Sequence, residues 1–203
     1  MNELANNSLK NIRLHLEMFR RVVLFIAVVL SSFQASSVMG AQSSCTTDAS
    51  YPAPNEKAQV FYLQRTGNAN TVVYTARLNP DGSINEYDPA HVYWRRFAED
   101  GRIKKLGFLE RNLAFGVEMR KWKTNTGKYI ANLVSYPKLK VLVEPTGDGG
   151  AHALLRISGK LVRLTCIYVE WRKSMGIIPN VLHFDVVGHT VDGNERMVER
   201  ILP

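Results

Sequence analysis

The chain has 203 residues and a formal net charge of +8, and its hydrophobic content of 45% is enough for a folded core. One segment near the N-terminus is strongly hydrophobic and no second one follows, which excludes a protein that crosses a membrane with several helices. No internal repeat or long linker divides the remainder, so its length suits one domain. A basic chain of this kind attracts anionic lipid headgroups and acidic polymers, and it binds nucleic acid only nonspecifically.

The N-terminal region carries the pattern of an export signal. The basic pair Arg20-Arg21 precedes an apolar run over residues 22–30, and small residues over 35–41 offer cleavage sites. The apolar run spans about a dozen residues at most, whereas a helix needs about 20 to cross a bilayer. We therefore expect cleavage between Ser37 and Ala41. The mature protein is predicted to lie in the periplasm or outside the cell, with no membrane span after cleavage.

The expected organisation has three parts. Residues 1–41 form the export signal, and translation from Met18 would make that signal compact, so residues 1–17 are predicted to be a misassigned start. Residues 42–58 form a flexible N-terminal arm, and residues 59–203 form a single β-rich domain. Removal of residues 1–41 takes away four basic and two acidic residues, which leaves the mature chain at a net charge of +6.

Cys45 and Cys166 are the only cysteines, one just after the predicted signal and one within an apolar stretch over residues 164–169. In an oxidising compartment they could form a disulfide that ties the mature N-terminus to the sheet. The alternative is a free Cys45 and a buried, unreactive Cys166, since a free cysteine often packs as a small hydrophobe. The sequence leaves both open.

Strand signals dominate the mature chain. Runs rich in β-branched and aromatic residues alternate with short turns rich in Gly, Asn, Asp and Ser. The predicted strands cover residues 60–65, 71–78, 91–96, 115–122, 128–136, 139–144, 151–157, 160–171, 181–188 and 195–202. Leu106, Leu109 and Leu113 are spaced by three and four residues, which predicts one short helix.

The turns also predict how the strands pair. Turns of two or three residues cannot return a chain to a parallel neighbour, so the sheet is predicted to be mainly antiparallel. The fold class is therefore all-β: an antiparallel meander, barrel-like or arranged as a two-sheet sandwich, with the short helix on one end. A barrel of this size can hold a small apolar ligand, although its own side chains fill the interior in the commoner case.

Several strand and turn motifs resemble one known family. They are residues 61–65 (FYLQR), 68–74 (NANTVVY), 78–82 (LNPDG), 91–94 (HVYW), 98–101 (AEDG), 114–117 (AFGV) and 167–170 (IYVE). Together they are similar to an uncharacterised bacterial family, domain of unknown function 4833, over nearly the whole mature chain. The resemblance implies membership of an exported family. It implies no activity, cofactor or catalytic residue.

The segment around His183 is the best candidate for chemistry. Strand alternation places His183 and Asp185 on one face, with Leu182, Phe184 and Val186 on the other. Side chains two residues apart lie about 7 Å apart at the backbone, near enough to share a metal or to form an oriented acid–base pair. Zinc needs three or four ligands and the spacing provides no third one, so a solvent-facing polar pair is the alternative.

Four aromatic residues, Tyr74, Tyr93, Trp94 and Tyr168, are candidate ligand-binding residues. Tyr and Trp pair an apolar body with a polar tip, so they can line a cavity or stack on sugar rings. Packing in the core is the alternative. The chain has no nucleophile motif or phosphate-binding loop, and no cofactor or metal is predicted.

Two functions remain. The first is a non-catalytic exported domain that binds a small apolar molecule or an anionic polymer of the cell envelope. The second is a hydrolase or lyase built on His183 and Asp185, with His91 or Glu170 as a further member. The sequence predicts no specific nucleic-acid partner.

Overall fold

The structure is a computed structural model, and residues 42–203 form one compact unit within it. It describes Cys45 and residues 52–123, 126–172 and 180–203. The predicted export signal, the start at Met18 and the cleavage sites lie outside the described residues, and so does part of the predicted arm. Those predictions stay predictions.

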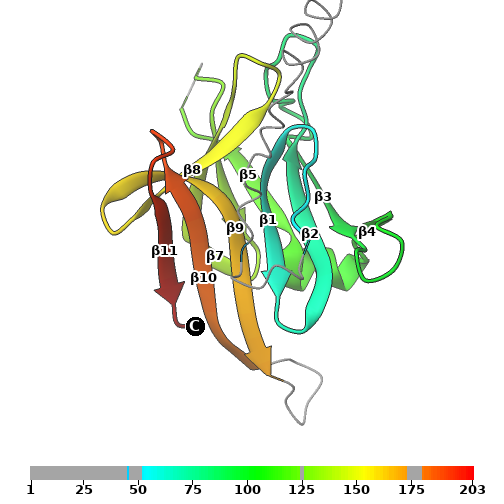
Figure 1. Ribbon diagram of the computed structural model, residues 1–203. Helices are drawn as coiled ribbons and strands as arrows, with labels where there is room; N and C mark the ends of the chain where they lie inside the picture. Colours follow the sequence, from blue (N-terminus) through cyan, green and yellow to red (C-terminus); the bar gives the residue numbers. More distant parts are fainter. Residues whose placement is uncertain (1–44, 46–51, 124–125, 173–179) are drawn as a thin grey trace, which may run out of the picture. The chain divides into compact units, whose positions relative to one another are not determined.

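The described residues form an all-β fold with one mixed sheet and one short helical segment (Figure 1). In chain order the elements are β1 (Gln59–Arg65), β2 (Asn68–Ala76), β3 (Ala90–Arg95), β4 (Ile103–Lys105), η1 (Glu110–Phe115), β5 (Val117–Lys121), β6 (Tyr129–Leu133), β7 (Tyr136–Pro145), β8 (Ala151–Ile157), β9 (Lys160–Arg172), β10 (Asn180–Thr190) and β11 (Arg196–Ile201). The all-β prediction is confirmed. The prediction missed β4, because three residues are too few to show alternation. It also gave a single strand over residues 128–136, whereas β6 ends at Leu133 and β7 begins at Tyr136.

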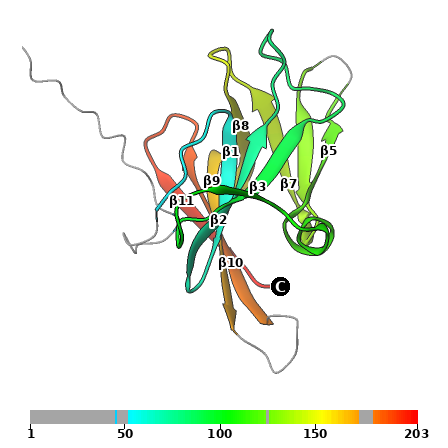
Figure 2. The same ribbon diagram turned by 90° about the vertical axis from the view of Figure 1, so that its right-hand side faces the viewer.

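The long strand β9 is the centre of the sheet. One edge of β9 pairs with β10, and β10 pairs with β11. The other edge pairs with β8 over residues 160–163 and then with β1 over residues 166–169. The sheet therefore divides at β9 into two layers, β1 to β4 and β5 to β8, which Figure 2 shows from the side.

The pairing explains why the sheet is mixed and open. Neighbours joined by short turns are antiparallel, as predicted, but β1 lies parallel to β9. A parallel pair needs a long connection, and the strands from β2 to β8 provide it. The order begins at β4 and ends at β5, which do not pair with each other among the described residues, so the sheet is not closed into a barrel.

The main core lies between the two layers. Val72 and Trp94 face each other across β2 and β3, and both are almost fully buried. Val141 of β7 and Ile157 of β8 belong to the same apolar cluster, as does Val162 at the start of β9. Burial of such side chains is worth about 1.5–3 kcal/mol each, so this cluster dominates the stability of the fold.

A smaller cluster covers the opposite face of β1, β9 and β10. It contains Cys45, Tyr62, Cys166 and Val187. The sulfur atoms of Cys45 and Cys166 lie at disulfide distance, with their Cα atoms 5.7 Å apart. The backbone N–H of Cys45 donates to the hydroxyl of Tyr62 at 3.0 Å. Of the two alternatives for the cysteines, this geometry agrees with the disulfide.

The predicted short helix is present, but its packing differs from the prediction. Leu106 is buried, whereas Leu109 and Leu113 are 66% and 69% exposed. The π-helical segment runs only from Glu110 to Phe115, so Leu106 precedes it and cannot share a helical face with Leu113. Glu110 anchors it instead, because its carboxylate accepts hydrogen bonds from the Trp94 indole at 3.1 Å and the Gly107 N–H at 2.7 Å.

Candidate ligand-binding pocket

A pocket of about 890 Å³ is lined on one side by β1, β9, β10 and β11 and on the other by η1, the end of β6 and the start of β7. Side chains from β1, β9, β10 and β11 form its sheet wall: Leu63, Arg65, Ile167, Val169, Trp171, Val181, Phe184, Val186 and Ile201. The facing wall comprises Leu113, Ala114, Phe115, Leu133, Ser135, Tyr136, Pro137, Lys138 and Leu139, and Pro203 lies at the margin. Most of these side chains are aliphatic or aromatic, as in sites for small molecules.

Strand alternation directs side chains into this pocket. Ile167 and Val169 of β9 face the pocket. Cys166 and Tyr168, which alternate with them along the strand, face the smaller cluster on the other side of the sheet. Apolar residues at every second position therefore make a continuous wall. The predicted alternation in β10 also places Phe184 and Val186 on this wall.

One detail of β10 departs from the predicted alternation. The pairing of β10 with β9 shifts in register between Val181 and His183. Such a shift changes which side chains face the same way along a strand. Val181 therefore lines the pocket, and Leu182, which the alternation placed with Phe184, is not among the lining residues.

Arg65 is the charged residue that β1 contributes to the pocket. Its guanidinium carbon lies 5.1 Å from the centre of the Trp94 ring and 5.8 Å from that of Phe115, which are cation–π distances. The Nε atom is buried and has no hydrogen-bond partner in the described residues. Burial lowers the pKa of the Arg65 guanidinium, while the charge of Glu110 acts in the opposite direction.

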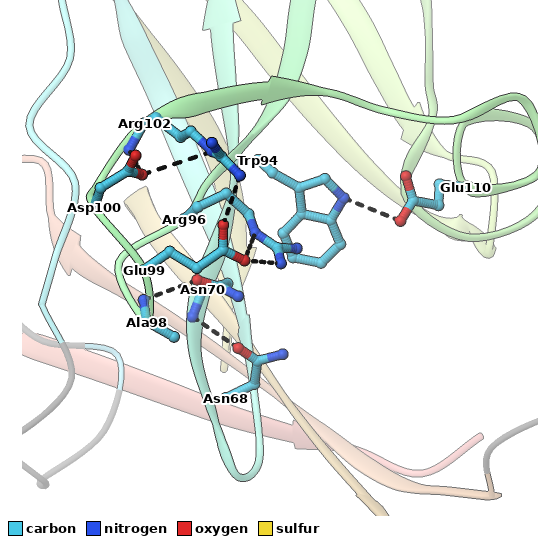
Figure 3. A network of polar contacts seen from close by, with 9 residues as sticks. All are labelled: Asn68, Asn70, Trp94, Arg96, Ala98, Glu99, Asp100, Arg102 and Glu110. Carbon is cyan, nitrogen blue, oxygen red and sulfur yellow. Dashed lines mark hydrogen bonds and ion pairs between the residues drawn. The ribbon is translucent and has the colours of Figure 1, made fainter.

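No carboxylate of the described residues lies within ion-pair distance of Arg65. The carboxylate whose charge acts on it, that of Glu110, already accepts bonds from Trp94 and Gly107. Figure 3 shows the first of these bonds beside the loop after β3, where Glu99 pairs with Arg96 and Arg102. The neighbouring acids are therefore engaged elsewhere, and the described contacts of the Arg65 guanidinium are with the rings of Trp94 and Phe115.

Two aromatic rings link the walls of the pocket. The ring of Tyr136, from β7, lies 5.4 Å from the ring of Phe184, from β10. Lys138, two residues further along β7, is exposed and also lines the pocket. Arg65 and Lys138 are the ionisable side chains with full charge at neutral pH among the lining residues, and both are positive. The pocket thus combines apolar walls with positive charge.

The predicted pair His183 and Asp185 lies together on the face away from the pocket. His183 Nε2 is 3.6 Å from Asp185 Oδ2. That distance is too long for a hydrogen bond. Arg200 donates two bonds of 2.8 Å to the Asp185 carboxylate, and its guanidinium holds the pKa of Asp185 below the ordinary value. The carboxylate is therefore already committed to an ion pair on β11.

His91 and His152 do not join this pair. His152 lies on β8, with Nε2 2.9 Å from Glu144 Oε1, and the ring of His91 lies tilted beside that of Tyr93 on β3, with the ring centres 4.8 Å apart. Glu170 sits opposite His183 in the β9–β10 pairing, and its carboxylate accepts hydrogen bonds from neighbouring hydroxyls. Within the described part of the chain, no three His, Cys, Asp or Glu side chains are arranged to hold a metal.

The four predicted ligand-binding aromatics are spread over both faces of the sheet. Tyr74 is buried in the main core, stacks on Phe61 and donates its hydroxyl to the Phe115 carbonyl at 2.9 Å. Trp94 is buried beside Arg65. Tyr93 is buried on β3, and burial raises its pKa to about 12. Tyr168 packs against the smaller cluster. The pocket is lined by other residues, and a binding role for these four stays a prediction.

The residue pattern of β1 contains a signal for Arg65, which was not among the predicted site residues. Leu63 and Arg65 occupy alternate positions of one strand, so they face the same way. A charged residue that continues an apolar stripe is unusual, since unpaired charges are costly to bury. Its chemical setting, however, depends on Trp94 and Phe115, which are far from it in the chain.

These features define a class of protein: an all-β domain on one open mixed sheet, with an apolar, positively charged pocket and a cysteine pair at disulfide distance. The chain belongs to the family called domain of unknown function 4833, whose sequence pattern matches residues 61–200. The resemblance seen in the strand motifs is thereby confirmed. No curated protein and no solved structure shows significant similarity to the chain. No helix among the described residues is long and apolar enough to cross a membrane.

Proposed function

We propose that this chain is an exported, non-catalytic domain that binds a small apolar ligand in the pocket beside Arg65. The pocket itself carries the proposal. Its volume of about 890 Å³ falls within the range of roughly 300–1,000 Å³ that is typical of small-molecule sites, and its walls are mostly apolar. Export is supported by the signal pattern over residues 19–41 and by the cysteine pair, since disulfides persist in oxidising compartments.

The distribution of reactive groups favours binding over catalysis. The lining side chains include no histidine, carboxylate or cysteine. Histidine, carboxylate and cysteine side chains carry most general acid–base and nucleophilic chemistry, and the lining groups that could share in it, Ser135, Tyr136 and Lys138, have no such side chain beside them in the pocket. His183 and Asp185, on which the alternative hydrolase or lyase depends, lie on the other face of β10, and Asp185 is paired with Arg200. A hydrolytic reaction at that pair would have to do without a free carboxylate.

Binding of the neutral dye Nile red tests the proposal. We expect its fluorescence to rise on binding to the purified mature protein. Leu113→Asn should weaken binding about fivefold, which corresponds to roughly 1 kcal/mol for a partly buried leucine. Leu109→Asn is the matched control, because Leu109 is equally exposed on the same segment but does not line the pocket. Absence of binding by the wild type, or equal loss in both variants, would contradict the proposal.

A further inference from the structure

We propose that the ligand of this pocket is an anionic amphiphile, whose acidic head binds the Arg65 guanidinium while its apolar body lies along β9 and β10. A fatty acid is the simplest molecule of this class. The inference rests on the proposed function, and it adds the chemical class of the ligand and the residue that recognises it.

The first argument is the state of Arg65. Its Nε is buried without a hydrogen-bond partner in the described residues, and an unpaired buried donor on a charged group is costly. The guanidinium carbon lies over the rings of Trp94 and Phe115, at 5.1 and 5.8 Å from the ring centres. Cation–π contacts of this kind stabilise the charge but use none of the five N–H donors. Those donors match the two oxygens of a carboxylate.

The second argument is the absence of a competing acid. Glu110 is held by Trp94 and Gly107, and no described carboxylate reaches Arg65 at ion-pair distance. The pocket wall carries Lys138 as a second cation and no acidic side chain. Positive charge beside apolar, poorly polarisable walls attracts anions more strongly than the same charge in water.

The third argument is the shape of the binding surface. From Arg65, the wall continues through Ile167 and Val169 to Phe184 and Val186 without another charged side chain. A ligand with one charged end and an apolar remainder satisfies both parts of this surface. A neutral apolar molecule would leave the guanidinium without a partner, and a polyanion would place charge against the apolar strands.

Three ligands with the same alkyl chain test the inference: dodecanoate, 1-dodecanol and dodecyl phosphate, each used to displace Nile red at pH 8. We expect wild-type protein to bind dodecanoate at least tenfold more tightly than dodecanol. Arg65→Met should reduce that ratio to about one, and the affinity of each variant for Nile red is measured first so that every displacement is referred to it. Stronger binding of dodecyl phosphate than of dodecanoate would identify a phosphate rather than a carboxylate as the preferred head.

Two controls keep the outcomes distinct. Arg65→Lys retains the charge without the planar donors, so it should keep part of the preference and also report on Arg65 if the methionine variant fails to fold. Lys140→Met removes a cation from the same strand as Lys138 but outside the pocket, and it should change nothing. Equal binding of acid and alcohol by the wild type overturns this inference and leaves the proposed function standing. Failure of wild type to bind any apolar ligand overturns both.

Discussion

Replacement of Phe184 by alanine measures how much the pocket wall contributes to stability. Replacing a fully buried phenylalanine by alanine in a packed core lowers the unfolding free energy by about 3–5 kcal/mol. Phe184 is only partly buried: it lines the pocket, where its ring lies 5.4 Å from that of Tyr136, and it also packs against the main core. The side toward the pocket loses little packing. We therefore expect about half the full cost, roughly 2 kcal/mol.

Thermal unfolding of the mature protein checks this magnitude. A loss of roughly 2 kcal/mol should lower the melting temperature by about 4–8 °C for a domain of this size. Phe108→Ala is the matched control, because Phe108 is 79% exposed and should change stability by less than about 0.5 kcal/mol. If the two variants melt at the same temperature, Phe184 does not pack as described, and the sheet wall of the pocket is wrongly assigned.

Two further predictions concern the cysteine pair and the ion pair on β11. Thiol titration of the unreduced, denatured protein should find no free thiol, and two free thiols would exclude the disulfide. Replacing Cys45 and Cys166 by serine should lower the unfolding free energy by about 2–4 kcal/mol. Arg200 keeps the folded-state pKa of Asp185 below its ordinary value of 3.8. The ion pair therefore stabilises the folded state fully above about pH 3.8, and this contribution is lost as the pH falls through the lower folded-state pKa. Asp185→Asn should therefore lower the melting temperature at pH 7 and have little effect near pH 2, and an equal loss at both values would show that the ion pair is not the cause.

The sequence predicted what depends on near neighbours in the chain. The predicted alternation separates Phe184 and Val186 from His183 and Asp185, and in the structure Phe184 and Val186 line the pocket whereas His183 and Asp185 do not. The short turns correctly implied antiparallel neighbours. These features are local, because a strand directs successive side chains to opposite faces whatever it pairs with.

Contacts between distant segments could not be predicted in the same way. The parallel pairing of β1 with β9 joins Tyr62 to Cys166, and no turn connects those strands. The leucine spacing around Leu109 indicated a helix, but whether its side chains are buried depends on what lies opposite. The pocket exists because these distant pairings bring β9 and β10 to face the η1 segment, so its position lay beyond any local pattern.

The open sheet leaves three strands, β4, β5 and β11, with one pairing partner each among the described residues. Unpaired strand edges invite other chains to add on, which is the first step towards aggregation. Each of these strands carries charge: two lysines in β4, Glu118, Arg120 and Lys121 in β5, and two arginines and a glutamate in β11. Extending the sheet from one molecule to the next would bring these charges together and strip them of water. The charges on these edges therefore oppose the addition of a further strand, although the sheet is not closed.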